Sequence, residues 1–88
     1  MKLIVLIVRD HDAEPTIQGL TQAGHRVTRI ASTGGFLRSG QATLLIGVDD
    51  AQVEAVLSLI RRLLPRTDPQ TARGLVFVLP VEHFEQIT

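Results

Sequence analysis

The order of the predicted elements indicates an α+β protein, a ferredoxin-like βαββαβ sandwich. In this fold two helices cover one face of an antiparallel four-stranded sheet. Three observations support it: apolar runs rich in β-branched residues, two segments with helical periodicity, and their alternation along the chain. The length of 88 residues suits one small domain, which we expect to span residues 1–88.

The first half of the chain predicts a strand, a helix and a second strand. Residues 2–8 are continuously apolar, which is typical of a strand covered on both faces. The acidic residues that follow favour a helix start, and Pro15 is tolerated in a first turn. Apolar residues at a spacing of three then lead to Gly24, a good helix stop, so we predict a helix over 13–23. Polar and apolar residues alternate imperfectly over 26–32, and this pattern predicts a strand.

The second half repeats this pattern in the order strand, helix, strand. Residues 43–48 form another apolar strand. Asp49 or Asp50 caps a helix with a wide apolar stripe, and Pro65 ends it. The remaining segments are a polar loop, a strand and a tail, predicted at 65–74, 75–79 and 81–88.

The second face of this sheet poses a problem, because two helices cover only one face. The strands at 2–8, 43–48 and 75–79 are apolar at nearly every position rather than at alternate ones. Leaving the uncovered face in water would forgo about 1.5–3 kcal/mol for each large aliphatic side chain. We therefore predict that the chain forms a homo-oligomer.

Composition argues against several classes of partner. Nine basic and nine acidic residues balance, which argues against general affinity for nucleic acid polymers or anionic membranes. The chain has no cysteine, so disulfides and thiolate metal sites are excluded, which fits a cytoplasmic protein. The apolar run at 2–8 is too short for a signal peptide or a membrane span.

Catalytic and metal-binding motifs are also missing. Residues 35–40 have the glycine spacing of a P-loop, but Gln41 and Ala42 stand where Lys and Ser or Thr are required. The acidic residues near His11 are explained more simply by a helix start, and the other two histidines are isolated. Cysteine-pair metallochaperones and aromatic-rich RNA-recognition domains of the same topology do not fit either. We expect no catalytic residues, no metal and no cofactor, although an amino-acid-sensing domain of this topology stays open.

The segment 32–40, with the sequence STGGFLRSG, is the strongest candidate for ligand binding. Its glycines allow backbone N–H groups to approach an anion closely. Phe36 offers a stacking face and Arg38 a planar charged fork. The alternative is an ordinary connection between strands, with Phe36 folded onto the core.

With this topology and loop, the chain resembles the PII-like cyclic di-AMP receptor family of bacterial signalling proteins. The matching segments are 1–4, 26–28, 32–40, 47–50 and 76–81, with Phe84. The resemblance implies a non-catalytic homotrimer that binds cyclic di-AMP in each cleft between neighbouring subunits. Ligand occupancy would reorder a loop that an unknown protein partner reads.

The resemblance also implies the residues of the ligand pocket: Arg26, Thr28, Gly35, Phe36, Leu37, Gln41, Gly47 and Gln86. Arg26 suits a phosphate, Thr28 a base edge or ribose hydroxyl, and Phe36 stacking on adenine. Without the family, the simpler interpretation is that Arg26 and Thr28 only face solvent.

Two departures from the family pattern keep other functions open. Position 41 is usually Asn in the family, and the connection at 65–74 is usually much longer. One alternative is a PII-like binder of ATP, ADP or another small anion. A second is an oligomeric interaction module that binds no ligand.

Overall fold

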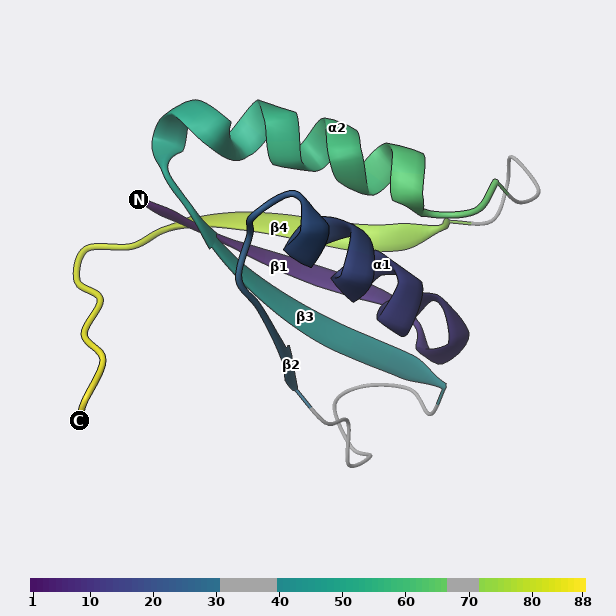
Figure 1. The fold of residues 1–88 in the computed structure, drawn as a ribbon, viewed down its shortest axis with the longest axis horizontal. Coiled ribbons are helices and arrows are strands. Elements are labelled where there is room, and N and C mark those ends of the chain that lie inside the picture. The colour runs from purple at the N-terminus through teal and green to yellow at the C-terminus, as the bar shows by residue number, and fades with distance from the viewer. Residues whose placement is uncertain (31–39, 67–71) are drawn as a thin grey trace.

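The computed structural model describes residues 1–30, 40–66 and 72–88. Figure 1 shows a four-stranded sheet with both helices on the same side of it. The elements are β1 (Lys2–Arg9), α1 (Asp10–Gln22), β2 (Val27–Ile30), β3 (Gln41–Val48), a 3₁₀ turn (Asp50–Gln52), α2 (Val53–Leu63) and β4 (Gly74–Pro80). The predicted ferredoxin-like βαββαβ order is confirmed.

The sheet has the strand order β2-β3-β1-β4, and every neighbouring pair is antiparallel. In β1, Ile4 lies opposite Ile46 of β3 and Val78 of β4. Strands β1 and β3 are central, whereas the edge strand β4 is also apolar throughout 75–79.

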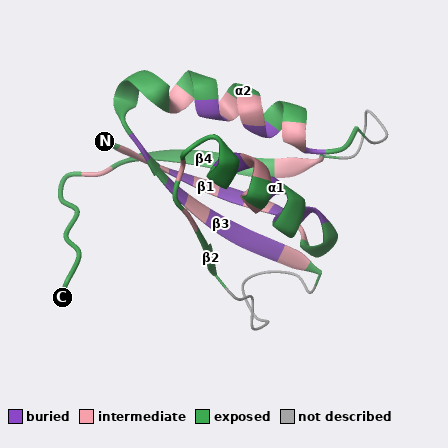
Figure 2. Ribbon diagram, in the orientation of Figure 1, coloured by how far each residue is buried: buried purple, intermediate pink, exposed green. Residues whose placement is uncertain are grey.

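Burial alternates along β1, because the helices cover only one of its faces (Figure 2). Ile4, Leu6 and Val8 are fully buried, whereas the residues between them are only half-buried. The single chain thus covers one face of β1, and cover for the second face depends on the predicted homo-oligomer. The core consists of Ile4, Leu6, Val8, Ala13, Leu20, Ala42, Leu44, Ile46, Val48, Val56, Ile60 and Leu64.

Helix α1 begins at Asp10, three residues before the predicted start. The backbone N–H of Asp10 donates to the carbonyl of Gly40 at 2.8 Å, so a group outside the helix satisfies it. Gly40 has a φ of +88°, a conformation that glycine adopts without strain. Pro15 consequently lies inside the helix, where it removes one hydrogen bond near the N-terminus.

The end of α1 follows the prediction closely. Gly24 has a φ of +93°, and its N–H donates to the carbonyl of Thr21 at 2.9 Å. The next N–H, that of His25, donates to the carbonyl of Leu20 at 3.0 Å. Together these bonds form a Schellman motif that ends the helix.

The other element boundaries differ from the predictions by a few residues. A 3₁₀ turn precedes α2, and the N–H of Gln52 donates to the carbonyl of Asp49 at 2.9 Å. Strand β3 begins at Gln41 because it continues pairing with the end of β1. The predicted strand at 26–32 is confirmed only for Val27–Ile30, and positions 31 and 32 lie outside the described residues. Neither helix in the described ranges is long and apolar enough to cross a membrane.

Candidate functional site

Strand β2 places Thr28 on the face of the sheet that the helices leave open. Thr28 lies opposite Leu45 of β3, whereas its neighbour Arg29 lies opposite the buried Leu44. On the helix side, Arg29 donates to Asp10 at 3.3 Å. Because side chains alternate along a strand, Thr28 points away from the helices, where it is exposed.

Gly47 and Arg26 belong to the same end of the sheet. Gly47 lies opposite Leu3 on the open face, and a Cβ added there would lie 3.3 Å from Met1 Cε. Arg26 is exposed and directly precedes β2, two positions from Thr28. The structure therefore brings three of the predicted pocket residues to one region of the open face.

The other predicted residues are distributed differently. Gln41 lies opposite Arg9 at the far end of β3, about 20 Å from Gly47 at a strand rise of about 3.4 Å per residue. Gln86 is exposed on the tail, which leaves the sheet at the end where the N-terminus lies (Figure 1). Gly35, Phe36 and Leu37 lie outside the described residues.

Thr43 is a polar residue of the open face that the sequence analysis did not select. It lies between Ile7 and Ile30 in the register and is 6% exposed. Within the described part of the chain, its buried hydroxyl has no hydrogen-bond partner. Such a group costs free energy unless something bonds to it, so Thr43 is a candidate contact for a ligand or for another segment. The sequence signal that could have identified Thr43 is a single hydroxyl residue within an otherwise apolar strand.

The open face is apolar over most of its area. In β4, Leu75, Phe77 and Leu79 lie in the same rows as the outward-facing residues of β1 and are 46–52% exposed. The same face carries Leu3, Val5, Ile7 and Leu45. A polar region around Thr28 thus adjoins a broad apolar surface.

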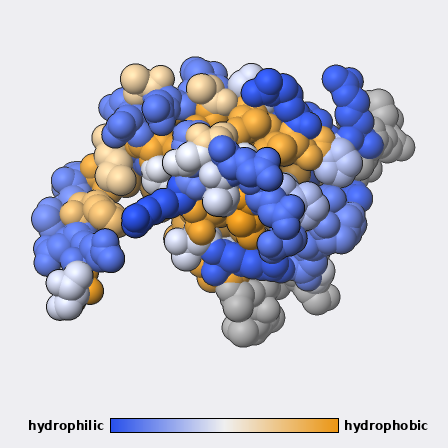
Figure 3. Space-filling model, in the orientation of Figure 1, coloured by the Kyte–Doolittle hydropathy of each residue, from blue (hydrophilic) through white to orange (hydrophobic). Residues whose placement is uncertain are grey.

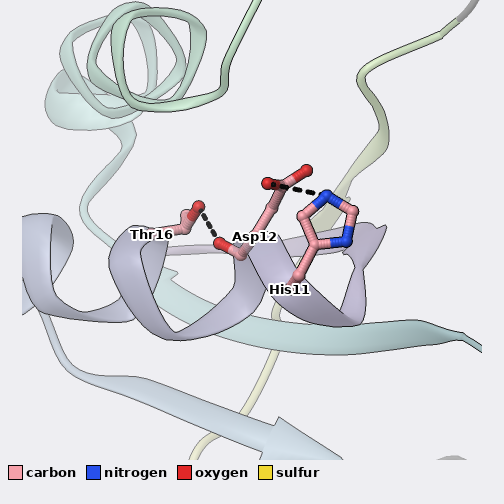
Figure 4. A network of polar contacts seen from close by, with 3 residues as sticks. All are labelled: His11, Asp12 and Thr16. Carbon is pink, nitrogen blue, oxygen red and sulfur yellow. Dashed lines mark hydrogen bonds and ion pairs between the residues drawn. The ribbon is translucent and has the colours of Figure 1, made fainter.

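Two clusters of polar contacts lie away from this face. At the start of α1, His11 Nε2 lies 3.4 Å from Asp12 Oδ1, and the Thr16 hydroxyl donates to the Asp12 carbonyl at 2.7 Å (Figure 4). The N-terminal amino group lies 2.8 Å from Asp50 Oδ1. Its hydrogen bond holds the pKa of Asp50 below the usual value. Within 1–30, 40–66 and 72–88, no three His, Asp or Glu residues gather to form a possible metal site.

Comparison with known proteins gives two results. Residues 1–68 match the family described as cyclic-di-AMP receptor. A solved structure from Pediococcus pentosaceus ATCC 25745, titled as a functionally unknown protein, is 33% identical with a TM-score of 0.76. The match covers 98% of this chain and 96% of that chain, so the two have nearly the same length.

Proposed function

Because the chain belongs to the cyclic-di-AMP receptor family, we propose that it is a non-catalytic sensor of this nucleotide and binds it between subunits of a trimer. The observation that carries the proposal is the position of Thr28, Gly47 and Arg26 at one end of the open face. Of the other residues that the resemblance implies, Gly35, Phe36 and Leu37 belong to the 31–39 segment, Gln86 belongs to the tail, and Gln41 begins β3 at its far end.

The chemistry of these three residues suits a cyclic dinucleotide. The Arg26 guanidinium would bind a phosphate through a charge-assisted hydrogen bond, which contributes about 1.5–3 kcal/mol. The Thr28 hydroxyl can both donate to and accept from a base edge or a ribose hydroxyl. Gly47 leaves space above the strand, since among the described residues only the flexible Met1 side chain lies near its missing Cβ.

Two features support a site shared between subunits. The exposed side chains of Leu75, Phe77 and Leu79 would each gain roughly 1 kcal/mol if a neighbouring copy covered them. The tail runs away from the body of its own chain (Figure 1), and its side chains Phe84 and Ile87 are 68% and 89% exposed. A neighbouring subunit would give these side chains a surface to contact and would bring Gln86 to a cleft.

The mechanism we propose is a shift of population. Cyclic di-AMP would favour one arrangement of the segment that precedes β3, and a partner protein would recognise that arrangement. Such a mechanism needs no catalytic residue, which agrees with the proposed role as a non-catalytic receptor.

Calorimetric titration of the purified chain with cyclic di-AMP, cyclic di-GMP and ATP tests the ligand. We expect micromolar or tighter binding of cyclic di-AMP alone, near one molecule per subunit. Stronger binding of ATP would instead indicate a mononucleotide sensor, and no heat with any of the three would indicate an interaction module. Sedimentation of the same sample tests the trimer, which a monomer at micromolar concentration would contradict.

A further inference from the structure

Four arginines gather at one end of the helix-covered side, away from the face that carries Thr28. Arg61 and Arg62 belong to the last turn of α2, Arg66 follows the helix, and Arg73 directly precedes β4. With Ser58 and Leu64 they line a cavity of about 440 Å³. The whole chain has nine Lys and Arg residues and no net charge, so this end carries a local excess of positive charge.

Capping of α2 explains only part of this cluster. Arg73 Nη1 donates to the carbonyls of Arg61 and Leu64, at 3.1 and 3.3 Å. Positive charge in the last turn is worth about 0.3–1 kcal/mol through the helix dipole. Neither effect requires Arg66, and Arg73 uses one of its guanidinium nitrogens in these bonds. The ion pairs found in the described ranges are made by other residues.

An apolar cavity adjoins the arginines. It has a volume of about 260 Å³, lies between α2 and β4, and shares Arg61, Leu64 and Arg73 with the first cavity. Its apolar lining comes from Leu6, Leu57, Ile60 and Val76. Figure 3, which views the helix-covered side, shows hydrophobic surface between the helices surrounded by hydrophilic side chains.

Gly74 keeps the apolar cavity open where β4 begins. A Cβ at this position would lie 3.1 Å from the carbonyl oxygen of Ile7 and 3.3 Å from Leu64 Cδ1. The small residue thus allows β4 to approach β1 without filling the space below α2. The two joined cavities lie within the size range of sites for small molecules, about 300–1,000 Å³.

We propose that these joined cavities bind a phosphate monoester with a compact apolar or aromatic body. Arginine forks match phosphate oxygens, and the exposed Arg62 and Arg66 line the cavity and make no ion pair with the residues that the structure describes. The body of the ester lies against Leu57, Ile60 and Val76. The site is separate from the proposed cyclic di-AMP site, since it uses the opposite side of the sheet and needs no second subunit.

Titration of the full ¹⁵N-labelled chain with phenyl phosphate at constant ionic strength tests the proposal. We expect saturable shifts at residues 58–64 and 73–76, and binding at least threefold tighter than that of inorganic phosphate. Arg66→Gln weakens phenyl phosphate binding at least threefold, whereas Lys2→Gln, which removes a charge at the other end of α2, leaves it unchanged. Leu57→Ala reduces the preference for phenyl phosphate over inorganic phosphate.

Absence of saturable shifts in the unmodified chain would overturn the proposal. Equal weakening by Arg66→Gln and Lys2→Gln would also overturn it, since only general charge attraction acts in that way.

Discussion

Arg29 Nη2 donates to Asp10 Oδ1 across 3.3 Å, and this contact joins the edge strand β2 to the first residue of α1. An exposed pair of this kind contributes at most about 1 kcal/mol, but it marks the helix-facing side of a short strand. The neighbouring Thr28 therefore faces the open side, as its pairing with Leu45 requires. The candidate site depends on this orientation.

Gly47 offers a test of how closely a ligand approaches β3. A Gly47→Ala variant places a methyl group on the open face, 3.3 Å from the end of the Met1 side chain. Because that side chain can move, we expect the free energy of unfolding to change by less than about 0.5 kcal/mol. Cyclic di-AMP affinity should fall at least fivefold in calorimetry. Unchanged affinity would place the ligand away from β3.

The apolar open face predicts a specific effect on assembly. Phe77 is 52% exposed on this face, in the middle of the edge strand β4 and opposite Val5. Phe77→Glu would bring an unpaired charge into a subunit interface, so we expect the variant to sediment as a monomer. Gln18→Glu, on the exposed side of α1, is the matched control and should leave the oligomer intact. An unchanged oligomer in the Phe77 variant would show that another surface makes the interface.

The packing of the two helices depends on Gly19. A Cβ at this position would lie 2.4 Å from Leu63 Cδ2 and 2.7 Å from Leu63 Cδ1. Gly19→Ala gains helix propensity of about 1 kcal/mol but forces Leu63 to move, at a cost of about 1–3 kcal/mol. We expect a net loss of about 1 kcal/mol in urea unfolding.

A double-mutant cycle with Leu63→Ala separates these two effects. The smaller side chain removes the clash, so Gly19→Ala should become stabilising in that background. If Gly19→Ala stabilised the original chain as well, the close contact between the helices would be contradicted.

Acidification should reveal the contact between the N-terminus and Asp50. The hydrogen bond from the amino group, helped by its charge and that of Lys2, lowers the pKa of Asp50 below the usual value of 3.8. A carboxyl with a depressed folded-state pKa contributes stability above its unfolded pKa, and this contribution is lost as the pH falls through the folded pKa. The chain should therefore be slightly more stable than Asp50→Asn at pH 7, and the difference in urea midpoint should disappear in acid. A difference that persists at pH 2 would contradict the contact.

The sequence was sufficient to predict the βαββαβ order, because apolar runs and helical stripes are local signals. Gly24 marked the end of α1 correctly, since its positive φ meets the needs of a Schellman motif. The start of α1 could not be predicted, because the N–H of Asp10 is satisfied by Gly40, thirty positions away. Pro15 then suggested a later start than the structure has.

The candidate site could be predicted less completely. The family resemblance supplied Thr28 and Gly47, but only the pairing register of β3 places both on the same face. Thr43 was missed because its burial depends on neighbouring strands. The arginine cluster could not be predicted from the sequence, since Arg73 reaches the end of α2 through the return of the chain into β4.

The central claim is that the open face at the start of β2 binds cyclic di-AMP, and two arginines in this region allow a direct test. Arg26 precedes Thr28 by two positions, whereas Arg29 turns to the helix side and contacts Asp10. The measurement is calorimetric titration of Arg26→Ala and Arg29→Ala with cyclic di-AMP, after sedimentation has established that both keep the assembly of the original chain. The account predicts at least a tenfold loss of affinity for Arg26→Ala and less than a twofold change for Arg29→Ala. Equal affinities for the two variants would contradict it.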